Sequence, residues 1–276
     1  MSVRSARYNL LSLRNPKGLT VIPEERDAWA FLDAAGITSS RQQKAIIFLV
    51  RALKHYGLWN KMKAVYPFVG GTPSSHKFNL KDPRDVDAAF RLTFVGGWTH
   101  SASGSAGNGT NTYADTYLVP NTHLTPYNTH ISEYLRNNIQ GAYDIASYKG
   151  SGFDIMDMGA RNGSDLFFSE MYTYPTTYIT SSNTDSRGFF TATRTNTTTL
   201  KLFKNNVQAG ATLTAVASNF TNLTGKTYIG NRTDLATTYT PREFSYISIG
   251  DGLTDAEATF LYNCVDRYQK FLGRAV

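Results

Sequence analysis

Short strand-like runs, separated by turn residues, recur along the chain from residue 88 onward and constrain the fold more than any other feature. The runs are too short for helices and are rich in aromatic and β-branched residues, which favour extended backbone. Such a series, in a chain of 276 residues, predicts one large all-β sandwich or jelly roll. The candidate strands are Phe90–Phe94, Ile131–Arg136, Asp144–Tyr148, Phe153–Met158, Leu166–Glu170, Thr176–Ile179, Phe189–Arg194, Thr199–Lys204, Tyr228–Gly230 and Phe244–Ile249.

Two apolar runs at the entry to this region are each followed by a pair of glycines. The first covers residues 64–69 and ends at Gly70-Gly71, and the second covers residues 88–95 and ends at Gly96-Gly97. Apolar runs ended by turn residues are typical of buried strands. Further along, Asn205-Asn206 follows a strand candidate and predicts a tight hairpin, because Asn tolerates positive φ.

Several phrases of the sequence carry a family resemblance: AVYPFVGGT, FNLKDPRD, FRLTFVGGWTHS, NGTNTYADTYLVP and SYISIGDGLTDAEATFLYNCVDRYQKFLGR. They resemble the concanavalin A-like lectin/glucanase (laminin G-like) domain found in virion proteins of tailed bacteriophages, over residues 59–276. The resemblance implies a mostly β protein, with a concanavalin A-like jelly-roll β-sandwich over residues 58–276 that ends in a C-terminal helix. It further implies a non-enzymatic structural protein of the virion, as a fibre, spike, decoration or tail component. A receptor-binding lectin for host-surface glycans is the alternative, and a glycan depolymerase is the third possibility.

The first 57 residues differ from the rest in pattern and in charge. Residues 1–85 hold 14 Lys and Arg against 6 Asp and Glu, whereas residues 86–276 hold 14 against 15. We expect an extended arm over residues 1–22, then two helices over about 23–35 and 40–56 that are each stopped by a glycine. Two helices of this size cannot bury a core alone, so they must pack on the β domain or on another subunit.

This basic segment, residues 1–57, is predicted to dock the protein onto other virion proteins. An excess of positive charge indicates an acidic partner, although an ordinary solvated helix face is the competing interpretation. Direct contact with nucleic acid is not favoured. A homo-oligomer, with a trimer favoured, is also expected, because symmetric assembly is usual for such components. The docking residues of the arm are Arg4, Arg7, Arg14 and Lys17.

The chain closes with a predicted helix. Thr254, followed three residues later by Glu257, forms a capping-box sequence, and Gly273 ends the helix. Cys264 is the single cysteine, so it forms no disulfide framework and is predicted to be a small apolar residue on this helix.

A glycine-rich loop at residues 103–109 is flanked by side chains of the kind that bind sugars, which supply aromatic faces and amide or carboxylate oxygens. Trp98 has a competing interpretation as a core residue, which is favoured. A calcium ion held by the Asn and Asp oxygens is a further possibility. The five histidines show no metal-binding spacing, and no metal or cofactor is predicted. The candidate glycan-binding residues are Trp98, His100, Asn108, Asn111, Tyr113 and Asp115.

The catalytic pattern of glucanases with this fold, Glu-x-Asp-x-x-Glu on one strand, is missing. Asp154 and Asp157 are three residues apart and would point to opposite faces of a strand. Glu133 and Glu170 stand alone in their strands and could meet only if those strands are neighbours. Because glycoside hydrolysis requires two carboxyl groups at a fixed separation, no catalytic residue is assigned and no enzymatic activity is predicted.

No targeting or membrane segment is predicted. Residues 1–20 alternate Arg with isolated apolar residues and lack the continuous apolar core of a signal peptide. No run approaches the ~20 apolar residues that a membrane span requires. The resemblance to virion proteins of tailed bacteriophages implies a location in the virion, after synthesis in the host cytoplasm.

Overall fold

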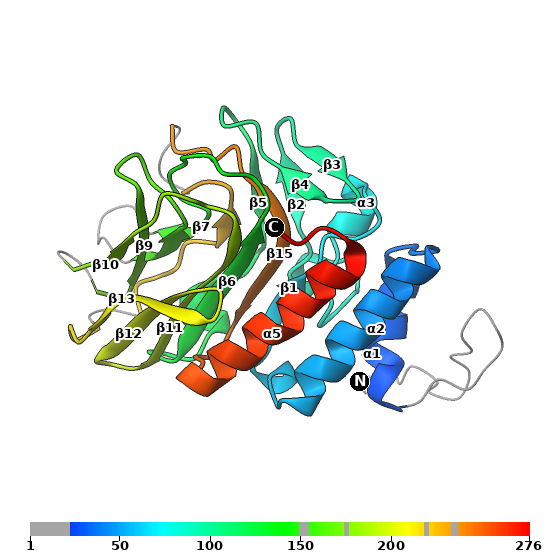
Figure 1. Ribbon diagram of the computed structural model, residues 1–276, viewed down its shortest axis with the longest axis horizontal. Coiled ribbons are helices and arrows are strands. Elements are labelled where there is room, and N and C mark those ends of the chain that lie inside the picture. The colour runs from blue at the N-terminus through cyan, green and yellow to red at the C-terminus, as the bar shows by residue number, and fades with distance from the viewer. Residues whose placement is uncertain (1–22, 149–154, 174–176, 218–220, 233–236) are drawn as a thin grey trace, which may run out of the picture.

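Figure 1 shows a computed structural model of the protein, which describes residues 23–148, 155–173, 177–217, 221–232 and 237–276. The predicted arm with Arg4, Arg7, Arg14 and Lys17 lies outside the described residues, as do parts of the candidate strands at 153–158 and 176–179.

The described strands form two antiparallel sheets that pack face to face, which confirms the predicted jelly-roll-like β-sandwich. The larger sheet runs in the order β13 (Val207–Leu213), β12 (Thr199–Lys204), β11 (Gly188–Asn196), β6 (Thr129–Leu135), β15 (Glu243–Gly250), β4 (Gly104–Ala106) and β3 (Thr99–Ser101), with β1 (Met62–Tyr66) also paired to β15. The smaller sheet runs in the order β10 (Ile179–Ser182), β9 (Leu166–Met171), β8 (Ile155–Gly159), β7 (Ile145–Tyr148), β14 (Tyr228–Ile229), β5 (Tyr113–Asp115) and β2 (Thr93–Val95).

The main core lies between the two sheets. Side chains on a strand alternate between its faces, so every second residue enters this core. Ile131 and Phe190 enter it from the eight-stranded sheet, and Met156 and Phe167 enter it from the seven-stranded sheet. The two sheets therefore bury their facing surfaces against each other, as sheets of a sandwich do.

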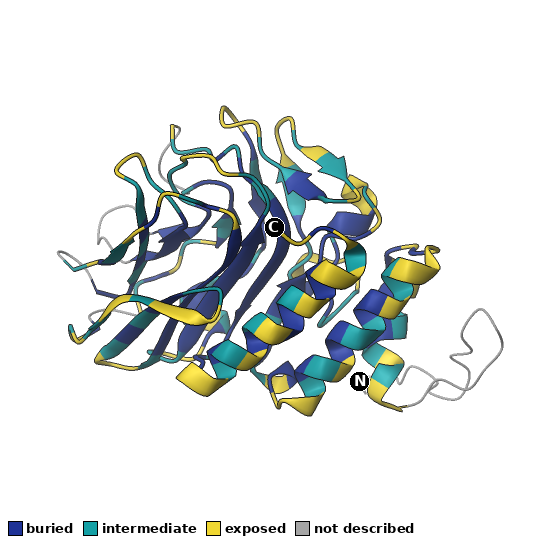
Figure 2. Cartoon of the chain, in the orientation of Figure 1, coloured by how far each residue is buried: buried dark blue, intermediate teal, exposed yellow. Residues whose placement is uncertain are grey.

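Helices α2 (Ser40–His55) and α5 (Asp255–Leu272) cover part of the outer face of the eight-stranded sheet, and the shorter helix α1 (Arg26–Ala34) packs against α2 (Figures 1 and 2). A second apolar cluster joins Leu49 of α2 and Tyr268 of α5 to Tyr134 and Tyr246 of the sheet. Strand β6 is consequently buried at all its positions, whereas β9 of the other sheet alternates between buried and half-buried. The outer face of the seven-stranded sheet is the more accessible one.

The short helical elements are η1 (Pro23–Glu25), η2 (Trp59–Lys61), α3 (Pro73–His76), η3 (Asp87–Ala89) and α4 (Pro120–His123). None of the described helices has the length and apolar character needed to cross a membrane.

Several sequence predictions are confirmed by these elements. Both N-terminal helices form, the hairpin turns at Asn205 with φ of 54°, and Thr254 and Glu257 make the capping box of α5. Cys264 is buried on α5, and burial raises the pKa of its thiol to about 12.

The strand predicted over residues 88–95 is wrong over its first half. That half is the 3-10 turn η3, followed by Phe90 in the left-handed region with φ of 58°. Only Thr93–Val95 is extended, because Phe90 turns the chain before it joins the sheet.

The predicted boundary between residues 57 and 58 falls just after α2. Apolar side chains from both sides of it share the second cluster, including Leu49 before the boundary and Tyr246 after it. The separate docking role of residues 1–57 remains a prediction.

Candidate functional site

A small cavity lies on the outer face of the seven-stranded sheet. Phe167 and Met171 of β9 face the core, so Phe168 and Glu170 between them point outward. On β8 the core residues Met156 and Met158 likewise place Asp157 outward. The cavity has a volume of about 310 Å³ and is lined by Ala142, Tyr143, Asp157, Asn162, Phe168, Glu170 and Tyr178.

Two carboxyl groups lie at the centre of this cavity lining. Asp157 is opposite Glu170 in the antiparallel register of β8 and β9, and its Oδ1 accepts a hydrogen bond of 2.8 Å from the Glu170 backbone N–H. Burial raises the pKa of Asp157 well above its usual range, and the neighbouring charge of Glu170 raises it further. Burial also raises the pKa of Glu170. Both carboxyl groups therefore bind a proton more tightly than they would in water, and a protonated carboxyl group can donate as well as accept hydrogen bonds.

We expect the Asp157 pKa to make stability depend on pH. A carboxyl group with a raised pKa in the folded state binds a proton more tightly there than in the unfolded chain, so the unfolding free energy falls as pH rises above the unfolded value of about 4. Asp157→Asn should make this slope shallower, by at most about 1.4 kcal/mol per pH unit, and should make the protein more stable at neutral pH. Urea denaturation between pH 4 and pH 8, on the order of five points, measures the slope.

The matched control for this experiment is Asp255→Asn, at a carboxylate that is 63% exposed and paired with Lys201 at 2.7 Å. This change should leave the slope close to that of the unmodified protein. An Asp157→Asn protein with an unchanged slope would contradict the raised Asp157 pKa.

An arginine and two tyrosines stand beside the carboxyl pair. The Arg232 guanidinium lies over the rings of Tyr143 and Tyr148, at 4.9 Å and 4.7 Å from their centroids, and donates a hydrogen bond of 3.2 Å to the Tyr143 hydroxyl. The Tyr143 ring meets Phe168 edge-to-face at 5.6 Å. The Arg232 charge lowers the pKa of both acids and so partly offsets the effect of burial. The site thus combines flat apolar faces with charged and neutral hydrogen-bonding groups.

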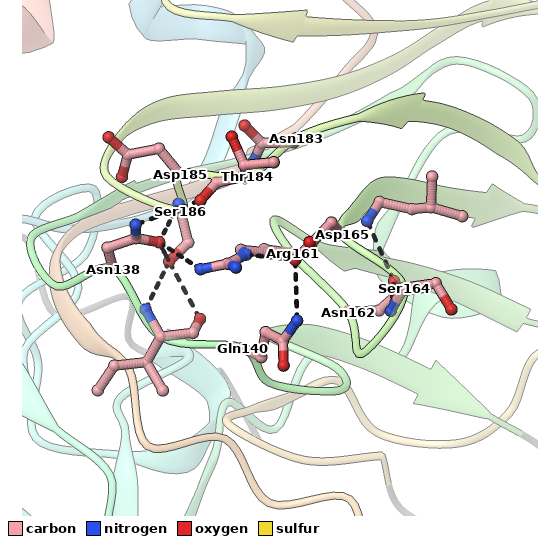
Figure 3. Close-up of polar contacts among 12 residues, drawn as sticks. Asn138, Gln140, Arg161, Asn162, Ser164, Asp165, Asn183, Thr184, Asp185 and Ser186 are labelled. Carbon is pink, nitrogen blue, oxygen red and sulfur yellow. Dashed lines mark hydrogen bonds and ion pairs between the residues drawn. The ribbon is translucent and has the colours of Figure 1, made fainter.

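A network of polar loop contacts holds one end of this site in place (Figure 3). Arg161 donates to Asp165 at 2.7 Å and to Asn138 at 2.9 Å, which ties the β8–β9 turn to the β6–β7 connection. Within the turn, Asn162 Oδ1 accepts from the backbone N–H groups of Ser164 and Leu166 at 2.9 Å and 3.1 Å. These bonds fix the Asn162 amide at the rim of the cavity.

The outer face of the same sheet continues toward β5 and β14 with further aromatic and charged side chains. Tyr113 and Tyr228 stack with ring centroids 4.7 Å apart, and Asp115 pairs with Lys226 at 2.7 Å. Lys226 also lies over the Tyr117 ring at 4.4 Å. Two of the predicted glycan-binding residues, Tyr113 and Asp115, therefore share a sheet face with the cavity.

The other predicted glycan-binding residues lie elsewhere. Trp98 packs on the main core and donates to the Tyr113 carbonyl at 3.1 Å, in agreement with its competing interpretation as a core residue. His100 is on β3 of the other sheet, with its Nδ1 2.9 Å from Nδ1 of His76. Burial and the neighbouring imidazole lower the pKa of His76 to about 3. Asn108 donates to Asn111 at 2.7 Å in an exposed loop.

The three loop residues considered for calcium have other partners. Asp115 pairs with Lys226 at 2.7 Å, and Asn108 donates to Asn111. Across the described residues, no group of three or more His, Cys, Asp or Glu side chains is arranged to hold a metal ion.

Glu133 and Glu170 do not come together, although the sequence allowed this pair if their strands were neighbours. Glu133 is on β6 of the eight-stranded sheet and is buried in the sandwich, while Glu170 lies on the outer face of the other sheet. Asp154 lies outside the described residues. Across strands, only Glu133 was predicted as a partner for Glu170, so the pairing of Asp157 with Glu170 was missed. The sequence did contain a signal for this pair, because β8 and β9 follow each other and are joined by a short turn. Residues at equal distances before and after such a turn face each other, which brings Asp157 opposite Glu170.

Comparisons with known proteins give structural matches only. No protein-family model matches the sequence, and no curated protein matches it. Domain 4 of AbnA, an extracellular arabinanase from Geobacillus stearothermophilus in complex with arabinotriose, is 12% identical with a TM-score of 0.52. That match covers 73% of this chain and 98% of the domain. Trypanosoma rangeli sialidase in complex with 2,3-difluorosialic acid is 12% identical with a TM-score of 0.53. That match covers 82% of this chain but only 39% of the sialidase.

What is shared is the β-sandwich. Identities this low show the fold alone. The predicted role as a structural component of a phage virion is contradicted by these matches, since the solved structures are a domain of an arabinanase and a sialidase rather than virion proteins. The alternative prediction, recognition of glycans, agrees with them better.

Proposed function

We propose that this protein is a carbohydrate-binding protein, whose binding site is the outer face of the seven-stranded sheet around Asp157, Glu170 and Arg232. The observation that carries the proposal is the cavity of about 310 Å³ in which aromatic rings and hydrogen-bonding groups converge. Rings such as Tyr143 and Phe168 offer flat apolar surfaces to a sugar ring, and the carboxyl and guanidinium groups match its hydroxyls.

The ligand is proposed to be an oligosaccharide rather than a single sugar. The cavity alone is at the small end of the range for ligand sites, which begins at about 300 Å³. Aromatic side chains continue along the face from Phe168 on β9 to Tyr113 on β5, four strand spacings or ~19 Å away. A chain of sugars lying across the strands would contact both ends of this row.

The finer fold assignment, a concanavalin A-like lectin domain, is part of the same proposal. It is supported by the sequence phrases quoted above and by the arrangement of eight-stranded and seven-stranded antiparallel sheets. The arabinanase domain in complex with arabinotriose, a related sandwich, supports glycan binding for this chain by analogy of fold.

We propose binding without cleavage. Hydrolysis needs one carboxylic acid that reaches the glycosidic oxygen and a second that attacks the sugar or activates water. Asp157 is only 2% exposed, and its Oδ1 is engaged by the Glu170 backbone N–H. Of the two acids only Glu170, which is half-buried, is therefore placed to hold a sugar hydroxyl, and a second accessible carboxyl group for cleavage is missing from the pair.

A carbohydrate array probed with the full chain tests the proposal, and isothermal titration then gives the affinity for the best ligand. Arg232→Gln is expected to weaken binding about tenfold or more, since a charged hydrogen bond contributes roughly 1.5–3 kcal/mol. Tyr143→Ala is expected to weaken it about fivefold, since a stacked ring contributes about 1 kcal/mol. Arg187→Gln, at a 51% exposed arginine paired with Asp185, is the matched control and should bind normally.

Absence of binding to any glycan, or full binding by both site variants, would overturn the proposed site. Release of reducing ends from the bound glycan, lost on Glu170→Gln, would show cleavage and overturn binding alone.

A further inference from the structure

A second and larger cavity lies on the opposite side of the sandwich, between α2 and α5. Its volume is about 540 Å³. Helix α2 contributes Lys44, Ile47, Phe48, Arg51 and His55, which recur every three or four residues and so lie along one side of the helix. Helix α5 supplies the facing wall with Cys264 and Arg267. These residues define the groove.

The floor and one end of the groove are apolar. Ile47 and Phe48 line it, and Tyr56 at the C-terminal end of α2 stacks on Phe260 of α5 with ring centroids 4.6 Å apart. Tyr56 and Phe260 are 42% and 36% exposed. An exposed aromatic pair beside a groove is typical of surfaces that bury apolar area on a partner.

The walls of the groove are positively charged. Lys44, Arg51 and Arg267 line it, and its described lining contains no Asp or Glu. Arg267 lies over the Phe48 ring at 4.9 Å. Arg51 is 58% exposed, and its ion pair with Glu25 is long at 3.6 Å, so this pair neutralises it little.

We propose that this groove binds an acidic amphipathic helix of a partner protein. From Lys44 to Tyr56 the groove follows α2 for about 18 Å, the length of a helix of about twelve residues. A helix packed between two others can place apolar side chains on Phe48 and the Tyr56–Phe260 pair. Carboxylates on its flanks would then meet Lys44, Arg51 and Arg267.

Charge argues against the two other occupants. The chain's own N-terminal segment, residues 1–22, carries Arg4, Arg7, Arg14 and Lys17 and no Asp or Glu. A second copy of the groove would bring the same cations face to face. Like charges across an interface oppose association, so both occupants are disfavoured.

The test uses the full chain and a fluorescently labelled peptide of about fourteen residues, with Leu along one helical face and Glu beside it. Fluorescence anisotropy at low salt is expected to show saturable binding that weakens as salt is added. Reversing two groove cations, with Arg51→Glu and Arg267→Glu together, should weaken binding about tenfold or more. Arg26→Glu, at an exposed arginine of α1 outside the groove, is the matched control.

Three outcomes that test the role of charge would overturn the proposal. The first is equal binding by a peptide with Lys in place of Glu, and the second is full binding by the doubly reversed variant. The third is loss of binding when Arg4, Arg7, Arg14 and Lys17 are all changed to Ser, which would place the acidic peptide on the arm. Circular dichroism of each variant checks that the helices remain folded.

The double variant Tyr56→Ala and Phe260→Ala changes the groove without changing its charge. Loss of peptide binding by this double variant supports the groove as the binding site, and unchanged binding counts against it.

Discussion

Replacing Arg242 with Met is expected to destabilise the protein by about 3–5 kcal/mol, because it leaves a buried carboxylate without its partner. Arg242 and Asp144 form an ion pair whose side chains are both fully buried. Arg242 also donates to the backbone carbonyls of Arg161 and Ile139, so the change removes these two hydrogen bonds as well. Chemical denaturation gives the loss as a change in the unfolding free energy.

Glu133 makes this region more sensitive to the change. Burial raises the pKa of Glu133 well above its usual range, and the charge of Asp144 raises it further, while Arg242 lowers it. Without Arg242, two buried carboxyl groups would remain. Adding Asp144→Asn to Arg242→Met should recover part of the lost stability, since an amide carries no charge to bury.

Arg187→Met is the control for this experiment, because Arg187 pairs with Asp185 on the surface and should lose less than about 1 kcal/mol. If Arg242→Met also lowered the unfolding free energy by less than about 1 kcal/mol, the buried ion pair would contribute little to stability.

Leu49→Ala is expected to cost about 2–5 kcal/mol, the usual range for removing a buried leucine side chain and leaving a cavity. Leu49 is fully buried on α2, in the cluster that joins the helices to the outer face of the eight-stranded sheet. Because this cluster includes Tyr134 and Tyr246 of that sheet, the loss should appear in one cooperative transition of the whole protein. Thermal denaturation followed both by far-ultraviolet circular dichroism and by tryptophan fluorescence measures it.

Ile47→Val on the same helix removes one methylene from a half-buried side chain and should cost less than Leu49→Ala. Two separate transitions in the Leu49→Ala protein, one for the helices and one for the sandwich, would contradict a shared core. They would favour instead the predicted division of the chain after residue 57.

Local patterns in the sequence were sufficient to predict the C-terminal helix and the hairpin. The capping residues Thr254 and Glu257 marked α5, and the Asn205 turn marked the hairpin of β12 and β13. Phe90 could not be anticipated, since a bulky residue in the left-handed region is held there by tertiary contacts rather than by its own preference.

The candidate site was harder to predict because it depends on pairings between strands. Asp157 and Glu170 are 13 residues apart and become neighbours only through the register of β8 and β9. Arg232 reaches them from a later part of the chain, beside Tyr143 and Tyr148. The burial that raises the Asp157 pKa is likewise a property of the assembled sheet.

The two outer faces of the sandwich thus differ in character. The helices cover the eight-stranded sheet and form a basic groove, whereas the seven-stranded sheet exposes aromatic, carboxyl and guanidinium groups. We assign a partner helix to the first face and carbohydrate to the second.

The most direct test of the carbohydrate site is to locate a bound oligosaccharide by NMR, using the best ligand from the array and full-length protein labelled with ¹⁵N. We expect the backbone signals of Asp157, Glu170 and Arg232 to shift on titration, with smaller shifts extending to Tyr113. Signals at His100 and along α2 should stay in place. Shifts confined to the loop of Asn108 and Asn111, or to the helical groove, would contradict the assignment of the site to the seven-stranded sheet.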